Sequence, residues 1–262
     1  MDAMELLWPL ESDSTASTLS DTDLLSFYSY PEPLNAPYIR ANLASTVNGN
    51  VAAAGQSAGI ASHADRILFG RLRRLADVIL VGAETVRAED CRGARKRDDV
   101  RAFRLARGQS EVPPVAVVSA SANLRPDSRL FTDTYVPPIV LTTEAAPKEN
   151  VSRLRAAGGD VLIAGETRLD IDRLNEIFAA RGLMRVLCEG GPTLLGSLIA
   201  ARAVDELCLT ITPFVGGAQN LSAGPEVEPS AMQLVSVLTS EGSLLLRYRR
   251  DDEAPSPQRA GK

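Results

Sequence analysis

The sequence contains little of what metal sites and disulfide frameworks require. Its 262 residues include three widely spaced cysteines and a single histidine, His63. Because no Cys-x-x-Cys pair occurs, the usual zinc sites and disulfide scaffolds are excluded, and we expect a cytoplasmic protein without a metal site. A zinc deaminase is excluded for the same reason, since its site needs a Pro-Cys-x-x-Cys segment and a further ligand near a glutamate.

Long apolar runs and concentrated positive charge are also missing. No run of about 18 apolar residues occurs, so no membrane span is predicted. The first residues, Met1 to Ser20, carry four acidic groups and no basic residue, which excludes a secretory signal. The net charge is −5, and the basic cluster Arg92–Arg107 is interrupted by Asp98 and Asp99. Nucleic acid is therefore not an expected partner, and a small-molecule substrate is.

The sequence does contain predicted strands that alternate with predicted helices, which is typical of an α/β domain. With 45% hydrophobic residues the chain can build a large core. Buried parallel strands are predicted at Val78–Gly82, Val115–Ser119 and Ile139–Thr142, and two late strands flank a turn at Glu241-Gly242. We expect a mixed, mostly parallel sheet flanked by helices, with a C-terminal antiparallel hairpin. Further helices are expected at Asp65–Leu75, Glu149–Ala157 and Asp170–Arg181, further strands at Tyr38–Thr46, Val161–Ala164 and Leu207–Phe214, and a mobile helix or loop at Glu89–Ser110.

The two ends of the chain differ from this pattern. Residues 1–36 are polar and marked by prolines, with one short helix expected at Asp21–Tyr30, and we interpret them as an extension packed on the main domain of residues 37–250. Residues 251–262 are polar and contain two prolines, which predicts a disordered tail.

The segment from Val186 to Ile199 carries the most information. A short apolar strand ends at a Glu189–Gly191 turn, and Pro192 follows where a first helical residue would lie. The glycines let backbone N–H groups approach a phosphate, and a helix start presents unpaired donors with a partial positive charge. This segment therefore predicts an anion site. The alternative is that the turn only connects a strand to a helix, as most turns of this kind do.

Four segments in the same order resemble the riboflavin-pathway pyrimidine reductases, and the resemblance covers residues 37–250. These reductases form the C-terminal domain of the bacterial bifunctional deaminase-reductases and share the dihydrofolate-reductase-like fold. Since no deaminase motif is present, the resemblance implies a stand-alone reductase. The matching segments are Ala41–Gly49, Ala76–Asp90, Glu189–Gly196 and Val204–Gly217.

The resemblance implies NADPH as the cofactor. The Gly82 and Thr85 turn would contact the dinucleotide, although Thr85 could instead cap a helix. Ser119 and Ser121, with Arg125, are candidates for the 2′-phosphate, although serines after a strand are also common in turns. The positions expected to contact the cofactor are Ala44, Gly82, Thr85, Glu89, Ser119, Ser121, Gly190, Gly191, Pro192, Thr193 and Leu194.

Substrate positions follow from the same resemblance. Asn48, Ser57, Arg73 and Glu189 match positions that hold a pyrimidine ribose-phosphate. Arginine and hydroxyl groups suit a phosphate, and a carboxylate accepts hydrogen bonds from the ring edge. Arg73 lies in the segment Arg71-Leu72-Arg73-Arg74, so it could equally face solvent. We expect Glu189 and Arg73 to bind the substrate rather than the cofactor.

Two departures from the family pattern bear on the chemistry. The family has Lys and Asp where this chain has Asn42 and Asn48. An amide neither gives nor takes a proton at neutral pH, so an acid–base role at Asn48 is excluded and no catalytic acid is identified. The preferred function is reduction of a ribosylamino-pyrimidine phosphate in riboflavin biosynthesis. A pterin or dihydrofolate reductase and a non-catalytic NADP-binding protein remain as alternatives, and the family resemblance implies a homodimer.

Overall fold

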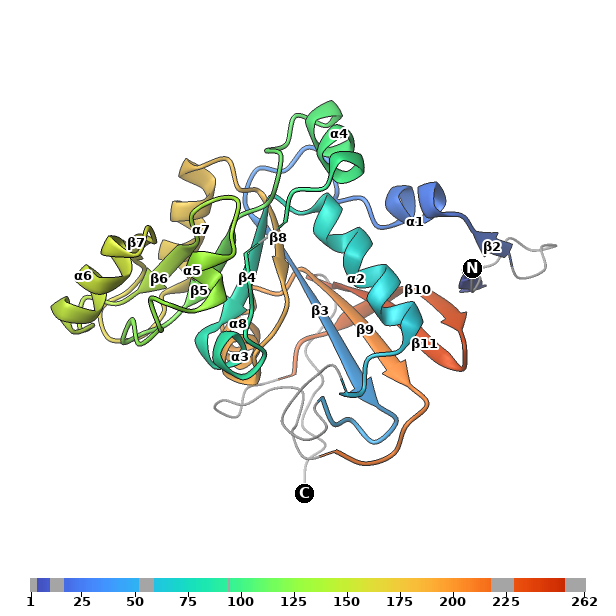
Figure 1. The fold of residues 1–262 in the computed structure, drawn as a ribbon. Coiled ribbons are helices and arrows are strands. Elements are labelled where there is room, and N and C mark those ends of the chain that lie inside the picture. Colours follow the sequence, from blue (N-terminus) through green and yellow to red (C-terminus); the bar gives the residue numbers. More distant parts are fainter. Residues whose placement is uncertain (1–3, 10–16, 52–58, 94, 218–228, 253–262) are drawn as a thin grey trace, which may run out of the picture.

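The fold is a mixed α/β sheet with helices on both faces (Figure 1). A computed structural model of the chain describes residues 4–9, 17–51, 59–93, 95–217 and 229–252. Among the helices of these residues, none is both long and apolar enough to cross a membrane.

The sheet has two halves that meet at one strand pair. Seven strands run parallel, namely β3 (Tyr38–Thr46), β4 (Val78–Gly82), β5 (Val115–Val118), β6 (Ile139–Thr142), β7 (Asp160–Ile163), β8 (Arg185–Cys188) and β9 (Glu206–Thr212). Four pair antiparallel, namely β1 (Met4–Trp8), β2 (Ser17–Leu19), β10 (Met232–Ser240) and β11 (Ser243–Arg250). The order across the sheet is β2-β1-β10-β11-β9-β3-β8-β4-β5-β6-β7. The predicted mixed sheet and its late antiparallel strands are confirmed.

Each face of the sheet carries its own apolar core. The helices are α1 (Asp21–Phe27), α2 (His63–Leu75), α3 (Ala83–Ala88), α4 (Asp98–Ala106), α5 (Arg129–Thr132), α6 (Lys148–Ala156), α7 (Ile171–Ala180) and α8 (Pro192–Ala200). Residues of α1, α2 and α6 share one core with Ile79 and Val81, whereas α7 and α8 pack on the other face with Val78 and Leu80. The alternation along β4 is that of a strand buried on both faces, as its continuous apolar run predicts.

The carboxyl edge of the parallel strands is stepped. β8 ends at Cys188, which lies opposite Ala41 in the middle of β3. β3 continues from there to Thr46, paired with β9 as far as Thr212. At about 3.3 Å per residue, the β3–β9 pair extends about 16 Å beyond the end of β8. Residues after β4 and β8 therefore lie beside a projecting wall made by β3 and β9.

The N-terminal residues are part of the same sheet. β1 pairs with β10, and α1 begins at a capping box in which Ser20 and Asp23 exchange hydrogen bonds. The end of α1 lies on two buried arginines: Arg40 donates to the Tyr28 carbonyl (2.7 Å) and Arg247 to the Phe27 carbonyl (2.5 Å). These cations satisfy carbonyls that the last helical turn leaves unpaired.

Glu206 holds the two arginines together. Arg40 Nε lies 2.5 Å from one carboxylate oxygen, and Arg247 Nη2 lies 2.9 Å from the other. The side chains of Arg40 and Glu206 are fully buried. Burial alone would raise the pKa of Glu206, but the two arginines lower it below its ordinary value. This cluster, Arg40–Glu206–Arg247, is called the α1 anchor below.

Several predicted elements differ from the structure in detail. The helix expected at Asp21–Tyr30 ends at Phe27, and Glu89–Ser110 contains the helix α4. The sequence analysis missed β1, β2, α3 and α5, all of which are short. The turn at Glu241-Gly242 is confirmed, since both residues have positive φ (48° and 76°), as a two-residue hairpin turn requires. Most of the predicted tail, residues 253–262, lies outside the described residues.

Candidate active site

The predicted phosphate turn has the geometry of an anion site. Gly190 and Gly191 follow β8 with φ values of 92° and 98°, in the region that only glycine adopts freely. Gly191 is the N-cap of α8, no side chain caps this helix, and Pro192 occupies its first turn. The backbone N–H groups at the start of α8 are thus left for a ligand.

A second helix starts beside this turn. Gly82 ends β4, caps α3, and donates its N–H to the carbonyl of Gly190 (3.2 Å). A Cβ atom built on Gly191 would lie 3.0 Å from the Thr85 hydroxyl oxygen, which shows how closely the two turns approach. The structure therefore brings Gly82, Thr85 and Gly190–Gly191 together, and Thr85 lies inside α3 rather than capping it.

The remaining predicted cofactor positions lie along the same edge. Ala44 is half-buried on β3, and Ser119 is buried just after β5, while Ser121 and Glu89 are exposed. Thr193 and Leu194 are in the first turn of α8, and the Thr193 hydroxyl donates to the carboxylate of Glu84 (3.4 Å). Arg125 is exposed and engaged with Asp127 at 2.8 Å. Its charge is therefore already paired within its own turn.

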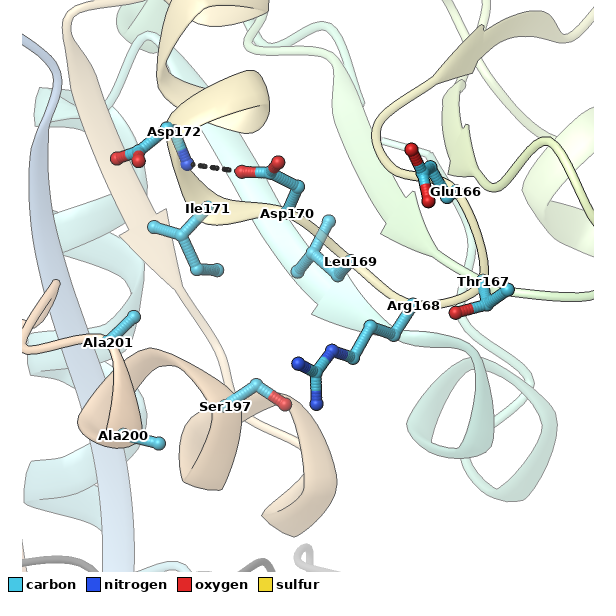
Figure 2. A pocket seen from close by; sticks show the side chains of 10 residues that line it. All are labelled: Glu166, Thr167, Arg168, Leu169, Asp170, Ile171, Asp172, Ser197, Ala200 and Ala201. Atoms are coloured by element: carbon cyan, nitrogen blue, oxygen red, sulfur yellow. Dashed lines mark hydrogen bonds between the residues drawn. The ribbon is translucent and has the colours of Figure 1, made fainter.

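A cavity of about 810 Å³ lies beside α8 on the face of α7. The loop between β7 and α7 forms one wall, and Ser197 and Ala200 of α8, with Ala201 just after it, form the other (Figure 2). In Figure 2 the guanidinium of Arg168 reaches from this loop toward α8. Arg168 forms no ion pair with any residue that the structure describes, in contrast to Arg125. The sequence analysis did not single out this loop.

Arg73 and Glu189 form a pair on the opposite face. Arg73 Nε and Nη2 lie 2.5 and 2.6 Å from the two carboxylate oxygens of Glu189. The Arg73 side chain is 39% exposed and that of Glu189 is 9% exposed. Although burial acts against it, the neighbouring carboxylate raises the pKa of Arg73. The structure thus joins the two residues that were expected to bind substrate, and each oxygen of Glu189 accepts one hydrogen bond from Arg73.

Buried polar side chains continue from this pair toward β9. Asn42, Asp65 and Thr210 are 5%, 7% and 1% exposed. The sequence analysis named Asn42 only as a departure from the family and did not identify Asp65. Its signal would have been a carboxylate on the buried stripe of an amphipathic helix, two turns before Arg73.

Asn48 and Ser57 are the other two predicted substrate positions, and the structure describes only Asn48. The amide oxygen of Asn48 accepts hydrogen bonds from the Thr46 hydroxyl and from the Gly216 N–H, both at 2.9 Å. Asn48 thus ties the end of β3 to the segment after β9. Ser57 lies outside the described residues.

The three cysteines of the described residues are not activated thiols. Burial raises the pKa of Cys91 to about 11 and those of Cys188 and Cys208 to about 12, so these thiols are protonated at neutral pH. The described residues form no cluster of potential metal ligands. The site offers anion-binding turns, one ion pair and buried hydrogen-bonding groups.

Comparison with known proteins identifies the family. The sequence model of the RibD C-terminal domain matches residues 37–246. The chain belongs to this family. The 2,5-diamino-6-ribosylamino-4(3H)-pyrimidinone 5′-phosphate reductase of Methanothermobacter thermautotrophicus is 33% identical over 70% of this chain and 81% of its own length. The riboflavin biosynthesis protein RibD of Chlamydia pneumoniae is 29% identical over 80% of the chain, which spans 53% of that protein.

Two solved structures have the same fold as this chain. A pyrimidine reductase-like protein from Corynebacterium diphtheriae superposes with a TM-score of 0.74 and 25% identity, covering 82% of this chain and 92% of its own. The riboflavin biosynthesis reductase of Saccharomyces cerevisiae superposes with a TM-score of 0.61 and 18% identity, over 85% and 93% of the two chains. The named relatives are reductases of the riboflavin pathway.

Proposed function

We propose that this protein is a cytoplasmic NADPH-dependent reductase that acts on a ribosylamino-pyrimidine phosphate, as its named relatives do. The observation that carries the proposal is the paired turn of Gly82 and Gly190–Gly191. A dinucleotide pyrophosphate needs close backbone approach and free N–H donors, and both are present at the start of α8. The glycine geometry and the nearby Thr85 hydroxyl therefore fit the cofactor.

The residues around this turn have separate roles. When bound, the cofactor would supply a hydride to C1′ of the opened sugar imine, and water would supply the proton for the imine nitrogen. Gly190–Gly191 and Thr85 would hold the pyrophosphate, and Arg73 would bind the phosphate of the substrate. Glu189 fixes the guanidinium of Arg73 through two hydrogen bonds. Catalysis here is mainly positioning of the two reacting carbons.

The adenosine half of the cofactor would lie beyond the pyrophosphate turn. Ser119 and Ser121 follow β5 on this edge, and the cavity beside α8 adds room and the guanidinium of Arg168, which has no ion-pair partner among the described residues. A preference for NADPH over NADH requires a cation for the 2′-phosphate. Arg168 is available for this role, whereas Arg125 is paired with Asp127.

The direct test follows the absorbance of reduced nicotinamide with each candidate substrate. We expect oxidation of NADPH with the ribosylamino-pyrimidine phosphate and none without substrate. Tight NADPH binding with no turnover of any pyrimidine or pterin would instead support the non-catalytic alternative. Turnover of dihydrofolate alone would support the pterin reductase.

A homodimer is part of the proposal. On the sheet face away from α2, Leu209, Ile211 and Leu246 are only half-buried, and Leu244 is 38% exposed. Half-exposed apolar side chains on adjacent strands suit an isologous interface between two copies. Light scattering at micromolar concentration should give twice the chain mass, and a monomer mass would contradict this.

A further inference from the structure

The end of α2 is not closed by a glycine. The helix ends at Leu75, and its C-cap residue, Ala76, has an extended backbone (φ −80°, ψ 146°) whose N–H donates to the Leu72 carbonyl (3.2 Å). A helix leaves its last carbonyls without partners inside the helix, and a left-handed glycine after the last turn commonly supplies donors to them. Because that glycine is missing, the four carbonyls of residues 73–76 need donors from another part of the chain.

Arg104 of α4 supplies most of these donors. Its Nη1 atom lies within hydrogen-bond distance of three carbonyl oxygens, those of Ala76 (2.5 Å), Arg74 (3.2 Å) and Arg73 (3.4 Å). The fourth carbonyl, that of Leu75, accepts from Nε2 of Gln109, just after α4 (3.0 Å). Figure 1 shows α4 at this end of α2. Two side chains from α4 and the turn after it therefore close the end of α2.

Arg104 is a buried cation whose hydrogen bonds all go to uncharged oxygens. It is 0% exposed, and it forms no ion pair with any residue that the structure describes. Its Nε donates to the carbonyl of Ser110 (2.8 Å), and its Nη2 donates to the hydroxyl of the same residue (3.3 Å). Burial lowers the pKa of Arg104 to about 10, so the side chain is still charged at neutral pH. A cation at a helix C-terminus is favoured by the helix dipole, which offsets part of the cost of its burial.

The helix end that Arg104 closes carries Arg73. The Arg73 guanidinium binds both oxygens of Glu189, and its Cζ lies 4.5 Å from the centroid of the Phe69 ring. The backbone from which this side chain extends is the one whose carbonyl accepts from Arg104. Arg73 is therefore held at both ends, with Arg104 on its backbone and Glu189 on its guanidinium.

We infer, resting on the reductase function proposed above, that Arg104 is a positioning residue for Arg73. By closing the end of α2, Arg104 fixes the backbone from which Arg73 reaches the phosphate of the substrate. A displacement of about 1 Å in a positioned group can cost about 100-fold in rate. The cofactor turns belong to α3 and α8, so Arg104 acts on the substrate and not on the cofactor.

The kinetic test compares two substrates, the ribosylamino-pyrimidine phosphate and the same compound without its phosphate. Arg104→Met keeps the length of the side chain and removes its donors. It should raise KM about fivefold or more for the phosphorylated substrate, with kcat and NADPH affinity changed less than about twofold. For the compound without phosphate, kcat/KM should also change less than about twofold. Arg104→Lys should recover most of the loss, because an ammonium group also donates to carbonyls.

A double-mutant cycle and a control link the effect to Arg73. In an Arg73→Ala background, Arg104→Met should change kcat/KM for the phosphorylated substrate by less than about twofold, since the side chain that it positions is gone. Arg155→Met is the control. Arg155 also donates to a carbonyl, that of Val161 (3.2 Å), but in β7 at the far edge of the sheet. This variant should change none of the constants.

A spectroscopic measurement tests the positioning without any substrate. The Nε–H of Arg73 lies 2.5 Å from Glu189 Oε1, counted from the nitrogen, so its proton should exchange slowly with water. Its signal in a ¹H–¹⁵N spectrum is assigned by its loss in Arg73→Lys. Exchange should be about tenfold faster or more in Arg104→Met and unchanged in the Arg155→Met control. If Arg104→Met does not fold, Arg104→Gln, whose shorter amide reaches fewer carbonyls, should show the same acceleration.

The outcomes separate this inference from the proposed function. An equal loss for both substrates, a full effect of Arg104→Met in the Arg73→Ala protein, or an unchanged Arg73 exchange rate would overturn the role of Arg104. Absence of turnover with either substrate would count against the reductase, and the exchange rate would still decide whether Arg104 positions Arg73. Faster exchange in Arg104→Met, together with normal kinetics in Arg73→Ala, would support the positioning and show that the phosphate binds elsewhere.

Discussion

The α1 anchor and the Arg73–Glu189 pair are built from the same residue types on the same face of the sheet, yet they differ in how far solvent reaches their charged side chains. In the anchor, Glu206 and Arg40 are fully buried, and the two arginines also bind the carbonyls at the end of α1. At the stepped edge, the Arg73 side chain is 39% exposed, although that of its partner Glu189 is only 9% exposed. Charges whose partners are all internal hold the fold, whereas charges left partly open are available to a ligand.

The largest expected effect is on the closed cluster. Glu206→Gln leaves Arg40 and Arg247 buried without a counter-charge, and should cost about 3–5 kcal/mol of unfolding free energy in urea titrations at neutral pH. Glu176→Gln, which breaks a surface pair with Arg173, should change it by less than about 0.5 kcal/mol. Similar losses in the two variants would contradict the comparison.

The same variant has a defined pH dependence. Because Arg40 and Arg247 lower the pKa of Glu206, its charged form stabilises the fold above its ordinary value of 4.5. That stability is lost as the pH falls below 4.5 and through the folded-state pKa. The difference between wild type and Glu206→Gln should therefore be constant near neutral pH and shrink at acidic pH. A constant difference down to low pH would show that charge is not its cause.

The next effect tests the cofactor turn. Gly191→Val should weaken NADPH binding at least tenfold, or about 1.4 kcal/mol, because a side chain there meets Thr85 and blocks the backbone. Gly182→Val is the matched control, since Gly182 also has positive φ (69°) but a Cβ atom added there would meet no other atom within 4 Å. Calorimetry should show a loss in the first variant only, and unchanged affinity in a folded Gly191→Val protein would refute the assignment.

The open ion pair should affect substrate and not cofactor. Arg73→Ala removes charge-assisted hydrogen bonds and should lower kcat/KM for a phosphorylated substrate about 10- to 100-fold. NADPH affinity should change less than about threefold. Arg74→Ala, on the same helix but paired with Asp99, is the control. Loss of NADPH binding in folded Arg73→Ala would show that the site is divided differently.

The smallest effect compares two arginines near the proposed adenosine site. Arg168→Ala should reduce the ratio of NADPH to NADH affinity several-fold, by roughly 1 kcal/mol, whereas Arg125→Ala should change it less than about twofold because Asp127 already pairs with that side chain. Binding titrations with both cofactors measure the ratio. A larger effect of Arg125→Ala than of Arg168→Ala would indicate that the 2′-phosphate binds at the turn after β5.

The same contrast explains what the sequence could predict. The apolar run of β4, the Gly-Gly-Pro turn and the Glu241-Gly242 hairpin are local patterns whose periodicity or backbone needs show in a few residues. β1 was missed because its strand character depends on pairing with β10 at the far end of the chain. Family resemblance located Arg73 and Glu189, but not their mutual contact across 116 positions. An aspartate in a first helical turn is ordinary, and only the course of α2 over β9 buries Asp65.

The stepped edge of the sheet separates two kinds of change available to this fold. Glycines and neighbouring helices fix the backbone of the turns after β4 and β8. A substitution in these turns is expected to weaken cofactor binding. Asn42 and Thr210 stand on the projecting strands, and Asp65 faces them from α2. Substitutions on this wall therefore leave the glycine turns untouched. One side of the edge can vary while the other keeps its backbone geometry.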